Sequence, residues 1–324
     1  MTDDEFIVRL YDALLLRSPN VAELRHHLSA LSDSRDPKET FLSFCNSEEF
    51  KDRRRERLLD IECINSCVTD SRVARLEKYR LRVLEILSPL NAQDVLHYKK
   101  VRIGRNHDGG YVMIDDFEGI DAAYSLGISD DVSWDLAFAE LDIDIFQYDH
   151  SINELPVKHN RFHWSKLKIA SESAFSNETI SLQRAFDGNA HSVSRDYIIK
   201  IDIEGSEWDM FADTDPSYLR AFRQIVCEFH GFHKIIDDRE YSKMVRAIQN
   251  VTTHHNVVHV HGNNFTPWAI IGGVAIPDTL EITFIRRQGR NFQPSKSVFP
   301  TSFDQPNNPE LADMYLGNFN FPVR

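Results

Sequence analysis

The sequence has few cysteines, no long apolar run and no excess of basic residues, and each absence excludes a class of protein. The four cysteines among 324 residues form no Cys-x-x-Cys pair, so neither a disulfide framework nor a structural zinc site is indicated. No stretch approaches the roughly 18 to 20 apolar residues of a membrane span, and the N-terminus is acidic where a signal peptide is basic. A formal net charge of −13 disfavours a broad nucleic-acid surface. We expect a soluble, cytoplasmic protein that binds no nucleic acid.

The dinucleotide-binding motif G-x-G-x-x-G is also missing. The apolar segment 122–126 ends in the single Gly127, without the further glycines that let a backbone approach a pyrophosphate, which disfavours a dehydrogenase. The next apolar segment ends in Asp149, about 20 residues later, where an acid can bond both ribose hydroxyls of an adenosine. This combination favours a nucleoside ligand without phosphate, of which S-adenosylmethionine is the common example. The alternative is that Asp149 is an ordinary turn residue.

The first 53 residues show a helical pattern. Apolar residues recur at helical spacing, and Ser18-Pro19-Asn20 and Asp36-Pro37 interrupt the recurrence. The residues that carry the pattern are Phe6, Leu10, Leu14, Leu15, Leu24, Leu28, Leu31, Phe41, Phe44 and Phe50. We therefore predict a small all-helical domain at residues 1–53.

A helical connector and an α/β domain are predicted to follow. Residues 54–97 read as two helices, the second from about Ser71 to Leu87. From residue 98 to residue 324 the pattern changes to short apolar strands separated by turns and helices. The strands are expected near residues 122–127, 143–149, 161–169, 197–203, 224–230, 256–261 and 279–286. Because no long helix separates the last pair, we predict a Rossmann-like, seven-stranded mixed sheet closed by an antiparallel hairpin.

Three of these strands end in pairs of ionisable residues at alternate positions: Asp202 and Glu204, Glu228 and His230, and His259 and His261. Because side chains alternate along a strand, each pair is expected to share one face. Ligands of open α/β sheets bind beyond the carboxyl ends of the strands, and His and carboxylates are the usual proton-transfer groups and cation ligands. We therefore predict a site at this rim. The alternative for the first pair is a capped turn in which Ser206 and Glu207 begin a helix.

Several motifs together resemble one family. They are Lys-Ile-Asp-x-Glu-Gly at Lys200–Gly205, Arg-x-Gly at Arg102–Gly104, Asp-Gly-Gly-Tyr at Asp108–Tyr111, and His-x-His-x-Asn-Asn at His259–Asn264. Over about residues 98 to 320, the chain resembles the FkbM-like S-adenosylmethionine-dependent methyltransferases. This resemblance implies the class I methyltransferase type of Rossmann-like fold.

A second resemblance concerns the N-terminal segment. The forms Leu16-Arg17-Ser18-Pro19-Asn20 and Ser47-Glu48-Glu49-Phe50 are similar to a small helical module of unknown function, found appended to glycosyltransferases and bacterial surface proteins. The match covers residues 3–53. It indicates work on glycans without naming a reaction, and the alternative is a packing or dimerisation element. We take this acidic segment as a candidate homodimer contact.

The methyltransferase resemblance implies a set of cofactor-binding residues, namely Asp108, Gly109, Gly110, Tyr111, Gly127, Ser129, Asp149 and His150. Gly127 and Ser129 would border the methionine part of S-adenosylmethionine, and Asp149 its ribose. The Asp-Gly-Gly-Tyr turn would cover the cofactor, and its glycines are expected to permit positive φ or close backbone approach. The single glycine in the turn after residue 126 departs from the commoner family pattern of two or three.

We hypothesise methyl transfer from S-adenosylmethionine to a hydroxyl of a sugar or polysaccharide. The expected catalytic residues are Asp202, Glu204, His230 and His261, and the expected acceptor-binding residues are Glu228, His259 and Asn264. A hydroxyl attacks well only when its proton is shared, so His230 or Asp202 is the predicted base. Asp202, Glu228 and His230 could also hold Mg²⁺ or Mn²⁺, as in some relatives that methylate antibiotic sugars.

Two readings from other classes remain open. A metal-dependent hydrolase could use the same acids and histidines, although no H-E-x-x-H helix is present. A catalytically degenerate domain could keep the fold and bind or scaffold glycans, because a fold does not determine a function. For a sugar ring the candidate aromatic platform consists of Phe232, Phe265, Trp268 and Tyr315.

Overall fold

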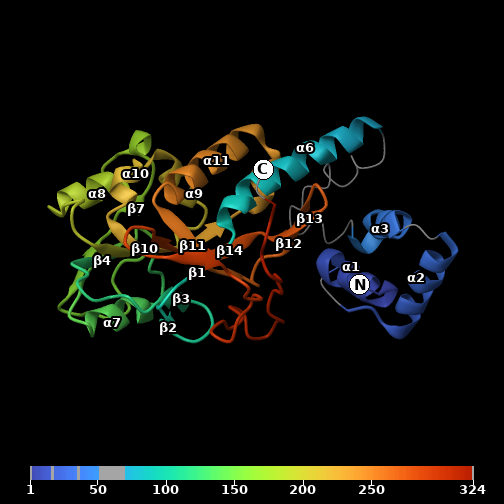
Figure 1. Cartoon of the computed structure of the whole chain (residues 1–324), viewed down its shortest axis with the longest axis horizontal. Helices are drawn as coiled ribbons and strands as arrows, with labels where there is room; N and C mark the ends of the chain where they lie inside the picture. Colours follow the sequence, from blue (N-terminus) through green and yellow to red (C-terminus); the bar gives the residue numbers. More distant parts are fainter. Residues whose placement is uncertain (1, 16–17, 35–36, 51–69, 323–324) are drawn as a thin grey trace. The chain divides into compact units, whose positions relative to one another are not determined.

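The computed structural model describes residues 2–15, 18–34, 37–50 and 70–322 (Figure 1). The chain forms two compact units, one of residues 1–80 and 267–275 and the other of residues 81–266 and 276–324. The first connector helix expected after residue 53, and the predicted boundary at that residue, lie outside the described residues. The predicted domain limits therefore stay predictions.

The first unit is helical over most of its described length. Its elements are α1 (Asp3–Leu10), a π-helix (Tyr11–Leu15), α2 (Val21–Ser34) and α3 (Pro37–Asn46). A capping box begins α1, because Thr2 Oγ1 accepts from Glu5 N while Glu5 Oε2 accepts from Thr2 N at 2.9 Å. Asn20 Oδ1 caps α2 in the same way. The buried core of this unit is Ile7, Leu10, Tyr11, Leu14, Leu15, Leu31, Phe44, Cys45 and Phe50, which confirms the helical pattern.

The long helix α6 (Asp70–Leu87) leads into the second unit and is followed by a short 3-10 turn at Ser88–Leu90. Its position confirms the helix expected at Ser71–Leu87. Pro89 lies in that turn, because a proline ring cannot continue an α-helix. A hairpin of β12 (Trp268–Ile271) and β13 (Val274–Pro277) is inserted later in the chain.

A seven-stranded mixed sheet forms the centre of the second unit, in the order β11-β14-β10-β9-β4-β5-β6. Its strands are β4 (Ala122–Leu126), β5 (Asp144–Tyr148), β6 (Phe162–Ser165), β9 (Tyr197–Ile201), β10 (Phe222–His230), β11 (His255–Gly262) and β14 (Thr279–Arg286). Only β14 runs antiparallel to its neighbours β10 and β11 within this sheet. The chain therefore has the predicted Rossmann-like, seven-stranded mixed sheet in one unit and a set of N-terminal helices in the other.

One predicted strand is shorter than expected. The segment 161–169 leaves the main sheet at Ser165, where Leu167 N donates to Ser165 O at 2.9 Å and turns the backbone. The remainder forms β7 (Lys168–Ile169), which pairs with β8 (Thr179–Ile180) in a separate two-stranded sheet. A short turn thus divides one apolar segment between two sheets.

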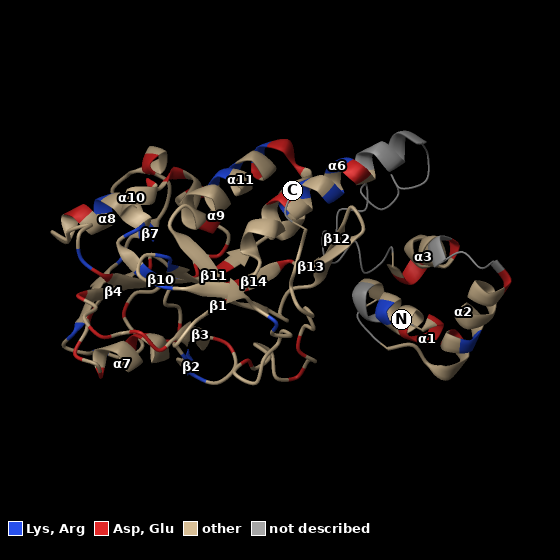
Figure 2. Ribbon diagram, in the orientation of Figure 1, with Lys and Arg blue, Asp and Glu red and all other residues tan. Residues whose placement is uncertain are grey.

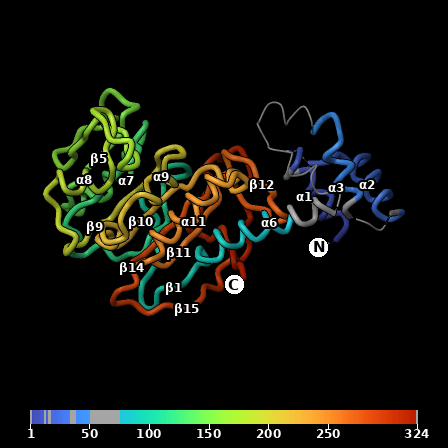
Figure 3. The backbone as a smooth tube through the Cα atoms, turned by 90° about the horizontal axis from the view of Figure 1, so that it is seen from above, coloured from blue at the N-terminus to red at the C-terminus, as the bar shows by residue number. Residues whose placement is uncertain are grey.

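Helices and a hairpin cover opposite faces of the main sheet (Figure 1). One face carries α8 (Leu182–Gly188), α9 (Glu207–Asp213), α10 (Pro216–Leu219) and α11 (Asp238–Thr252). Seen from above, α11 lies along β11, and α8 lies toward the part of the sheet that holds β5 (Figure 3). The other face carries α7 (Ser133–Ala139) and the hairpin of β2 (Lys100–Ile103) and β3 (Tyr111–Ile114). A small sheet of β1 (Gln93–Val95) and β15 (Phe292–Pro294) completes the unit.

Each face is held by apolar packing. Met244, Ala247, Ile248 and Val251 are the buried residues of α11 and recur at helical spacing. Figure 2 shows the Lys and Arg residues of the same helix in blue and its Asp and Glu residues in red. On the hairpin side, a core cluster joins Tyr111 and Met113 to Trp134 and Val226. The hairpin is thereby packed against β9 and β10.

Gly127 lies where the turn after β4 approaches the end of β9. Its φ is +80°, and a Cβ atom there would lie 1.6 Å from the carbonyl oxygen of Asp202. Gly127 N donates to Tyr148 O at 3.0 Å, and Asp202 N donates to Leu126 O at 2.9 Å. The turns that follow three neighbouring strands are therefore tied together at a point where only glycine fits.

We expect Gly127→Ala to lower the free energy of unfolding by about 3 kcal/mol or more in urea denaturation. The left-handed conformation costs alanine roughly 1–2 kcal/mol, and the overlap with the Asp202 carbonyl adds roughly 1–3 kcal/mol. Gly289→Ala is the matched control, since Gly289 has φ +76° and nothing within 4 Å of the added Cβ. Equal losses in the two variants would contradict the close approach.

Candidate active site

The strand register places a row of ionisable side chains across three neighbouring strands. Glu228 of β10 lies opposite Glu281 of β14, which in turn lies opposite His261 of β11. Directly opposed residues share a face of the sheet. This face is the one covered by the β2–β3 hairpin, because Thr283 Oγ1, two residues from Glu281, donates to Val112 O at 2.5 Å. Glu281 was missed by sequence reasoning, although a glutamate amid the apolar strand 279–286 could have indicated it.

Four acids from four segments meet beneath the hairpin, and we name them the carboxylate cluster: Asp108, Asp202, Glu228 and Glu281. The potential ligand atoms of Asp108, Glu228 and Glu281 lie within 4.8 Å of one another. Those of Asp202, Glu228 and His230 do so as well. The loop of the Asp-Gly-Gly-Tyr motif is thus brought to the same place as the ends of β9 and β10.

Burial raises the proton affinity of two members of the cluster, Glu228 and Asp202. Burial raises the pKa of Glu228 well above its ordinary value, and the charges of Asp202 and Glu281 raise it further. Burial also raises the pKa of Asp202, to about 6, against the opposing charges of Lys200 and His230. The Asn263 amide donates to Glu228 Oε1 and partly offsets its burial. Glu228 and Asp202 therefore hold a proton more tightly than exposed carboxylates do, and in their ionised form they attract a cation.

The predicted pairing of Asp202 and Glu204 on one strand face is wrong. Strand β9 ends at Ile201, and Glu204 has φ +53° in the turn that follows, with Gly205 at φ +94°. The side chain of Glu204 is 85% exposed, while that of Asp202 points inward with a buried Oδ1. The backbone instead forms the strand-to-helix turn that was the alternative, because Glu207 is the first residue of α9.

His230 lies between the turn and the cluster. Its Nδ1 is 3.2 Å from Glu207 Oε1, and its Nε2 is 3.6 Å from both Glu204 Oε2 and Glu228 Oε1. Burial lowers the pKa of His230, but the hydrogen bond and charge of Glu207 outweigh this effect and raise the pKa to about 8. Four of the residues expected at the rim, Asp202, Glu204, Glu228 and His230, are brought together.

Three of the residues expected near the cofactor, Ser129, Asp149 and His150, lie in the turns that follow β4 and β5. Asp149 Oδ2 accepts from Ile128 N at 2.8 Å and from Ser129 N at 2.9 Å, and its Oδ1 accepts from the Ser151 backbone and hydroxyl. These four bonds approach the capacity of a carboxylate, so Asp149 shapes the turn after β4. Ser129 has φ +51°, and His150 is exposed.

The hairpin loop confirms what was expected of its glycines. Gly109 has φ +84°, and a Cβ atom on Gly110 would lie 2.1 Å from the carbonyl oxygen of Arg105. Arg105 also lies 3.6 Å from Asp131 Oδ2, in the segment that leads into α7. The loop is therefore compact, and Tyr111, which follows it, is buried against the cluster with its pKa raised well above the usual value by burial and by Asp202.

Comparison with protein families identifies the central segment. Residues 120–260 match the methyltransferase FkbM domain. The chain contains a methyltransferase FkbM domain. Residues 1–54 match a domain of unknown function, DUF4214, which is compatible with the small appended module expected there. Comparison with curated proteins found no match. The matched methyltransferase segment runs from just before β4 into β11, so Asp108 and Glu281 lie outside it.

The C-terminal strap, residues 299–317, is attached to the methyltransferase domain through β11. His259 Nε2 pairs with Asp304 Oδ1 at 2.7 Å, and both side chains are almost completely buried. Asn264 Nδ2 donates to Asn308 O at 2.9 Å, and Asn308 N donates back to Asn264 Oδ1 at 2.7 Å. His259 and Asn264 therefore hold the strap in this structure, and their expected role in acceptor binding stays a prediction.

The strap also reaches the carboxylate cluster. Asn307 Nδ2 donates to Glu281 Oε1 at 2.6 Å and to Asp108 Oδ1 at 3.3 Å. His261 bridges Glu281 Oε2 at 2.9 Å and Asp313 Oδ1 at 3.0 Å. Burial alone would lower the pKa of His261, but these two carboxylates raise it to about 10. His261 is thus a buried positive charge that neutralises part of the cluster, and its expected catalytic role stays a prediction.

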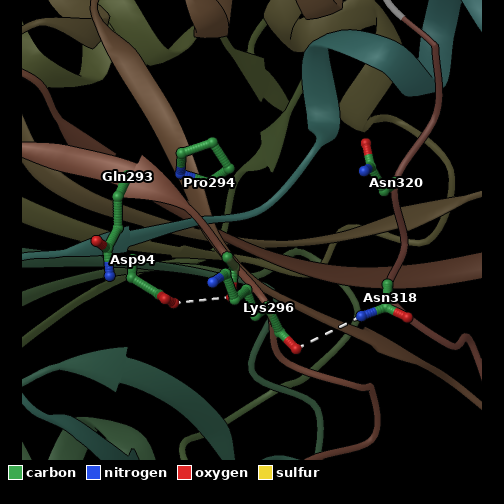
Figure 4. Close-up of a pocket in the computed structure, with 7 residues that line it drawn as sticks. Asp94, Gln293, Pro294, Lys296, Asn318 and Asn320 are labelled. Atoms are coloured by element: carbon green, nitrogen blue, oxygen red, sulfur yellow. Dashed lines mark hydrogen bonds between the residues drawn. The ribbon is translucent and has the colours of Figure 1, made fainter.

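A separate pocket lies apart from this chemistry (Figure 4). It is lined by Asp94, Gln293, Pro294, Ser295, Lys296, Asn318 and Asn320. Ser295 Oγ donates to Asp94 Oδ1 at 2.8 Å, and Asn318 Nδ2 donates to Lys296 O at 3.4 Å. None of its lining residues belongs to the carboxylate cluster, so this pocket and the candidate active site are separate.

Across the described part of the chain, no helix meets the length and apolarity that crossing a membrane requires.

We expect Asn264→Ala to release the C-terminal strap. The change removes the acceptor for Asn308 N and the donor to the carbonyls of residues 308, 311 and 312. Unsatisfied buried groups cost roughly 1–3 kcal/mol, so amide hydrogen exchange within residues 299–317 should accelerate by about tenfold or more.

The matched control is Asn318→Ala, because Asn318 is exposed and donates one 3.4 Å hydrogen bond. That variant should leave exchange in the strap unchanged. If both variants exchange alike, Asn264 does not hold the strap.

Proposed function

We propose that this methyltransferase transfers a methyl group from S-adenosylmethionine to a hydroxyl of a sugar or polysaccharide. The observation that carries the proposal is the meeting of Asp202, Glu228 and His230 at the carboxyl edge of a methyltransferase sheet. Ionised carboxylates only accept hydrogen bonds, and a hydroxyl is a donor that suits them. The family match supports methyl transfer in general, and the acceptor and cofactor are our proposal.

The side chains beside the β4 turn fit a cationic cofactor. Among the described residues, Asp202 Oδ1 is buried and has no hydrogen-bond partner, and the Asp202 backbone closes on Gly127. S-Adenosylmethionine carries positive charge at its sulfonium and its ammonium, which buried carboxylates stabilise. Gly127 and Ser129 would hold the methionine part, and Asp149 would bond the ribose by giving up its hydrogen bonds from Ser151. When bound, this cofactor supplies the electrophilic methyl group.

The role of the protein is alignment and removal of one proton. Methyl transfer needs oxygen, carbon and sulfur in line within a site shielded from water. Asp202, with a pKa of about 6, is ionised at neutral pH and can accept the hydroxyl proton. His230, with a pKa of about 8, is mostly protonated at neutral pH and becomes a competent base as the pH rises.

Two exposed aromatic residues that follow side chains of the site in the sequence support a carbohydrate acceptor. Phe265 and Tyr315 are 59% and 62% exposed. Each lies two residues beyond a side chain of the site: Asn263, which bonds Glu228, and Asp313, which bonds His261. Aromatic faces beside a few convergent polar groups are typical of sites that bind ring-shaped ligands. By contrast, Phe232 is fully buried against Trp208, so its expected place in such a platform is wrong.

A divalent cation is the alternative means of activating the hydroxyl, because a cation bound by Asp202 and His230 would leave neither of them free to act as the base. Asp202, Glu228 and His230 offer the oxygen and imidazole ligands that Mn²⁺ accepts, and carboxylates suit Mg²⁺. A cation there would offset the repulsion between Asp202 and Glu228 and would acidify an acceptor hydroxyl. Activity that is lost on chelation and restored by Mg²⁺ or Mn²⁺ would support this alternative, and activity unaffected by chelation would remove it.

We expect S-adenosylhomocysteine to bind the purified protein in isothermal titration calorimetry, and Asp149→Asn to weaken binding by about tenfold or more. An amide in place of the carboxylate loses a charged acceptor, and hydrogen bonds to charged groups contribute roughly 1.5–3 kcal/mol.

Ser151→Ala is the control for this titration. It frees one acceptor position on Asp149 without touching the turn after β4, so it should leave binding unchanged or tighten it. No binding by the unmodified protein would argue for the degenerate glycan-binding reading. Normal binding by Asp149→Asn would remove Asp149 from the ribose site.

We expect Asp202→Asn and His230→Gln each to lower turnover by about 10²–10⁴-fold, the usual contribution of acid–base groups. The measurement is S-adenosylhomocysteine release with a panel of sugar and oligosaccharide acceptors. Affinity for S-adenosylhomocysteine, which lacks the sulfonium charge, should stay within a few-fold, because neither change removes the turn at Gly127. Unchanged turnover in both variants would remove the assignment of these residues to the reaction.

A further inference from the structure

The sequence pattern explains Glu207 only as the start of a helix. Glu207 follows the N-cap Ser206 as the first residue of α9, and it is completely buried. A helix start favours an acidic residue, but that preference is worth only about 0.3–1 kcal/mol at a surface. Burying a carboxylate costs several kcal/mol, so a helix-capping role alone does not account for it.

The contacts of Glu207 are concentrated on one oxygen. Its Oε1 accepts from Ile203 N at 3.0 Å and from Gly205 N at 3.2 Å, and it lies 3.2 Å from His230 Nδ1. The two backbone bonds hold the turn in which Glu204 and Gly205 both adopt positive φ. The same carboxylate thus shapes the turn that follows Asp202 and touches the imidazole opposite it.

His230 is held from α9 by its backbone as well as by its ring. Trp208 Nε1, in the residue after Glu207, donates to His230 O at 2.6 Å. With the backbone fixed and Nδ1 turned to Glu207, Nε2 is directed toward Glu204 and Glu228, at 3.6 Å from each. A carboxylate cannot donate, so a neutral imidazole beside Glu207 must carry its proton on Nδ1.

We propose that Glu207 is a positioning residue that fixes His230 in the Nδ1–H tautomer and presents the Nε2 lone pair to the acceptor hydroxyl. The proposal rests on the proposed function for the identity of the acceptor. As the hydroxyl oxygen bonds to the methyl carbon, the carbon–sulfur bond breaks with its electron pair staying on sulfur, and the hydroxyl proton moves to Nε2. Glu207 then stabilises the imidazolium, as the buried acid of a Ser-His-Asp triad does. If a cation binds at Nε2, the same carboxylate orients the ligand.

The direct test is the tautomer of His230, read by long-range ¹H–¹⁵N NMR on the full chain labelled with ¹⁵N-histidine. The pH is set above the His230 pKa of about 8, so that the ring is neutral. The resonance is identified by its loss in His230→Gln. We expect the Nδ1–H tautomer, and an Nε2–H tautomer in the unmodified protein would overturn the proposal without reference to any variant or activity.

Glu207→Gln extends the test with an almost unchanged shape. The glutamine carbonyl can still accept from Ile203 N, Gly205 N and His230 Nδ1, so the turn and the tautomer are retained, but the charge that stabilises the imidazolium is lost. We expect the Nδ1–H tautomer to persist and kcat to fall by about 10–10²-fold with KM within a few-fold, the loss expected for a hydrogen bond to a charged group. A folded Glu207→Gln protein with unchanged kcat would overturn the role of Glu207 in the reaction.

Glu204→Gln is the matched control for the NMR measurement. Glu204 also lies near His230, but it is exposed and faces Nε2. We expect the Nδ1–H tautomer to persist in this variant, and its loss would show that Glu204, not Glu207, selects the tautomer. If the protein binds no cofactor and yet shows the expected tautomer, the proposed function fails while the Glu207–His230 arrangement stands.

Discussion

Burial of like charges at one edge of the main sheet is the constraint on which the rest of the site depends. Glu228 is almost completely buried beside Asp202 and Glu281, and each neighbour raises its pKa. Such an arrangement persists only if donors and positive charges reach it. Asn263 does so from the end of β11, while His230 supplies positive charge from the end of β10, the strand of Glu228 itself. The segments around the sheet therefore provide hydrogen-bond donors and positive charge to the buried carboxylate of Glu228.

This constraint gives the two segments outside the matched methyltransferase domain a physical role. The hairpin loop contributes Asp108, and the C-terminal strap contributes Asn307, whose amide joins Asp108 to Glu281. The strap is itself held by two buried histidines, His259 and His261, which pair with Asp304 and Asp313. One of these histidines is a structural contact and the other a counter-charge, so histidines two residues apart on one strand serve the site in different ways.

Much of the fold followed from residue patterns, and part of the site did not. Continuous apolar runs predicted the seven strands within a few residues, because buried strands have little freedom in composition. The strand ends predicted Asp202, Glu228 and His230 together, since parallel strands end at a common edge. Alternation failed at Glu204, where the strand stops at Ile201 and two positive φ values follow. The alternation of side chains along a strand does not show where the strand ends. Here the chain turns because of Gly205 and the buried hydrogen-bond acceptor Glu207.

The sequence by itself determined the class of sheet, the positions of its strands and the family motif, because these depend on local hydrophobicity and on short spacings. Only the tertiary structure decided which acids meet. Glu281 joins Glu228 through antiparallel register, Asp304 reaches His259 across 45 positions, and Glu207 turns from a helix start into a partner of His230. Such contacts join residues far apart in the chain, and they are selected by the cost of leaving a buried charge without a partner, which no local pattern expresses.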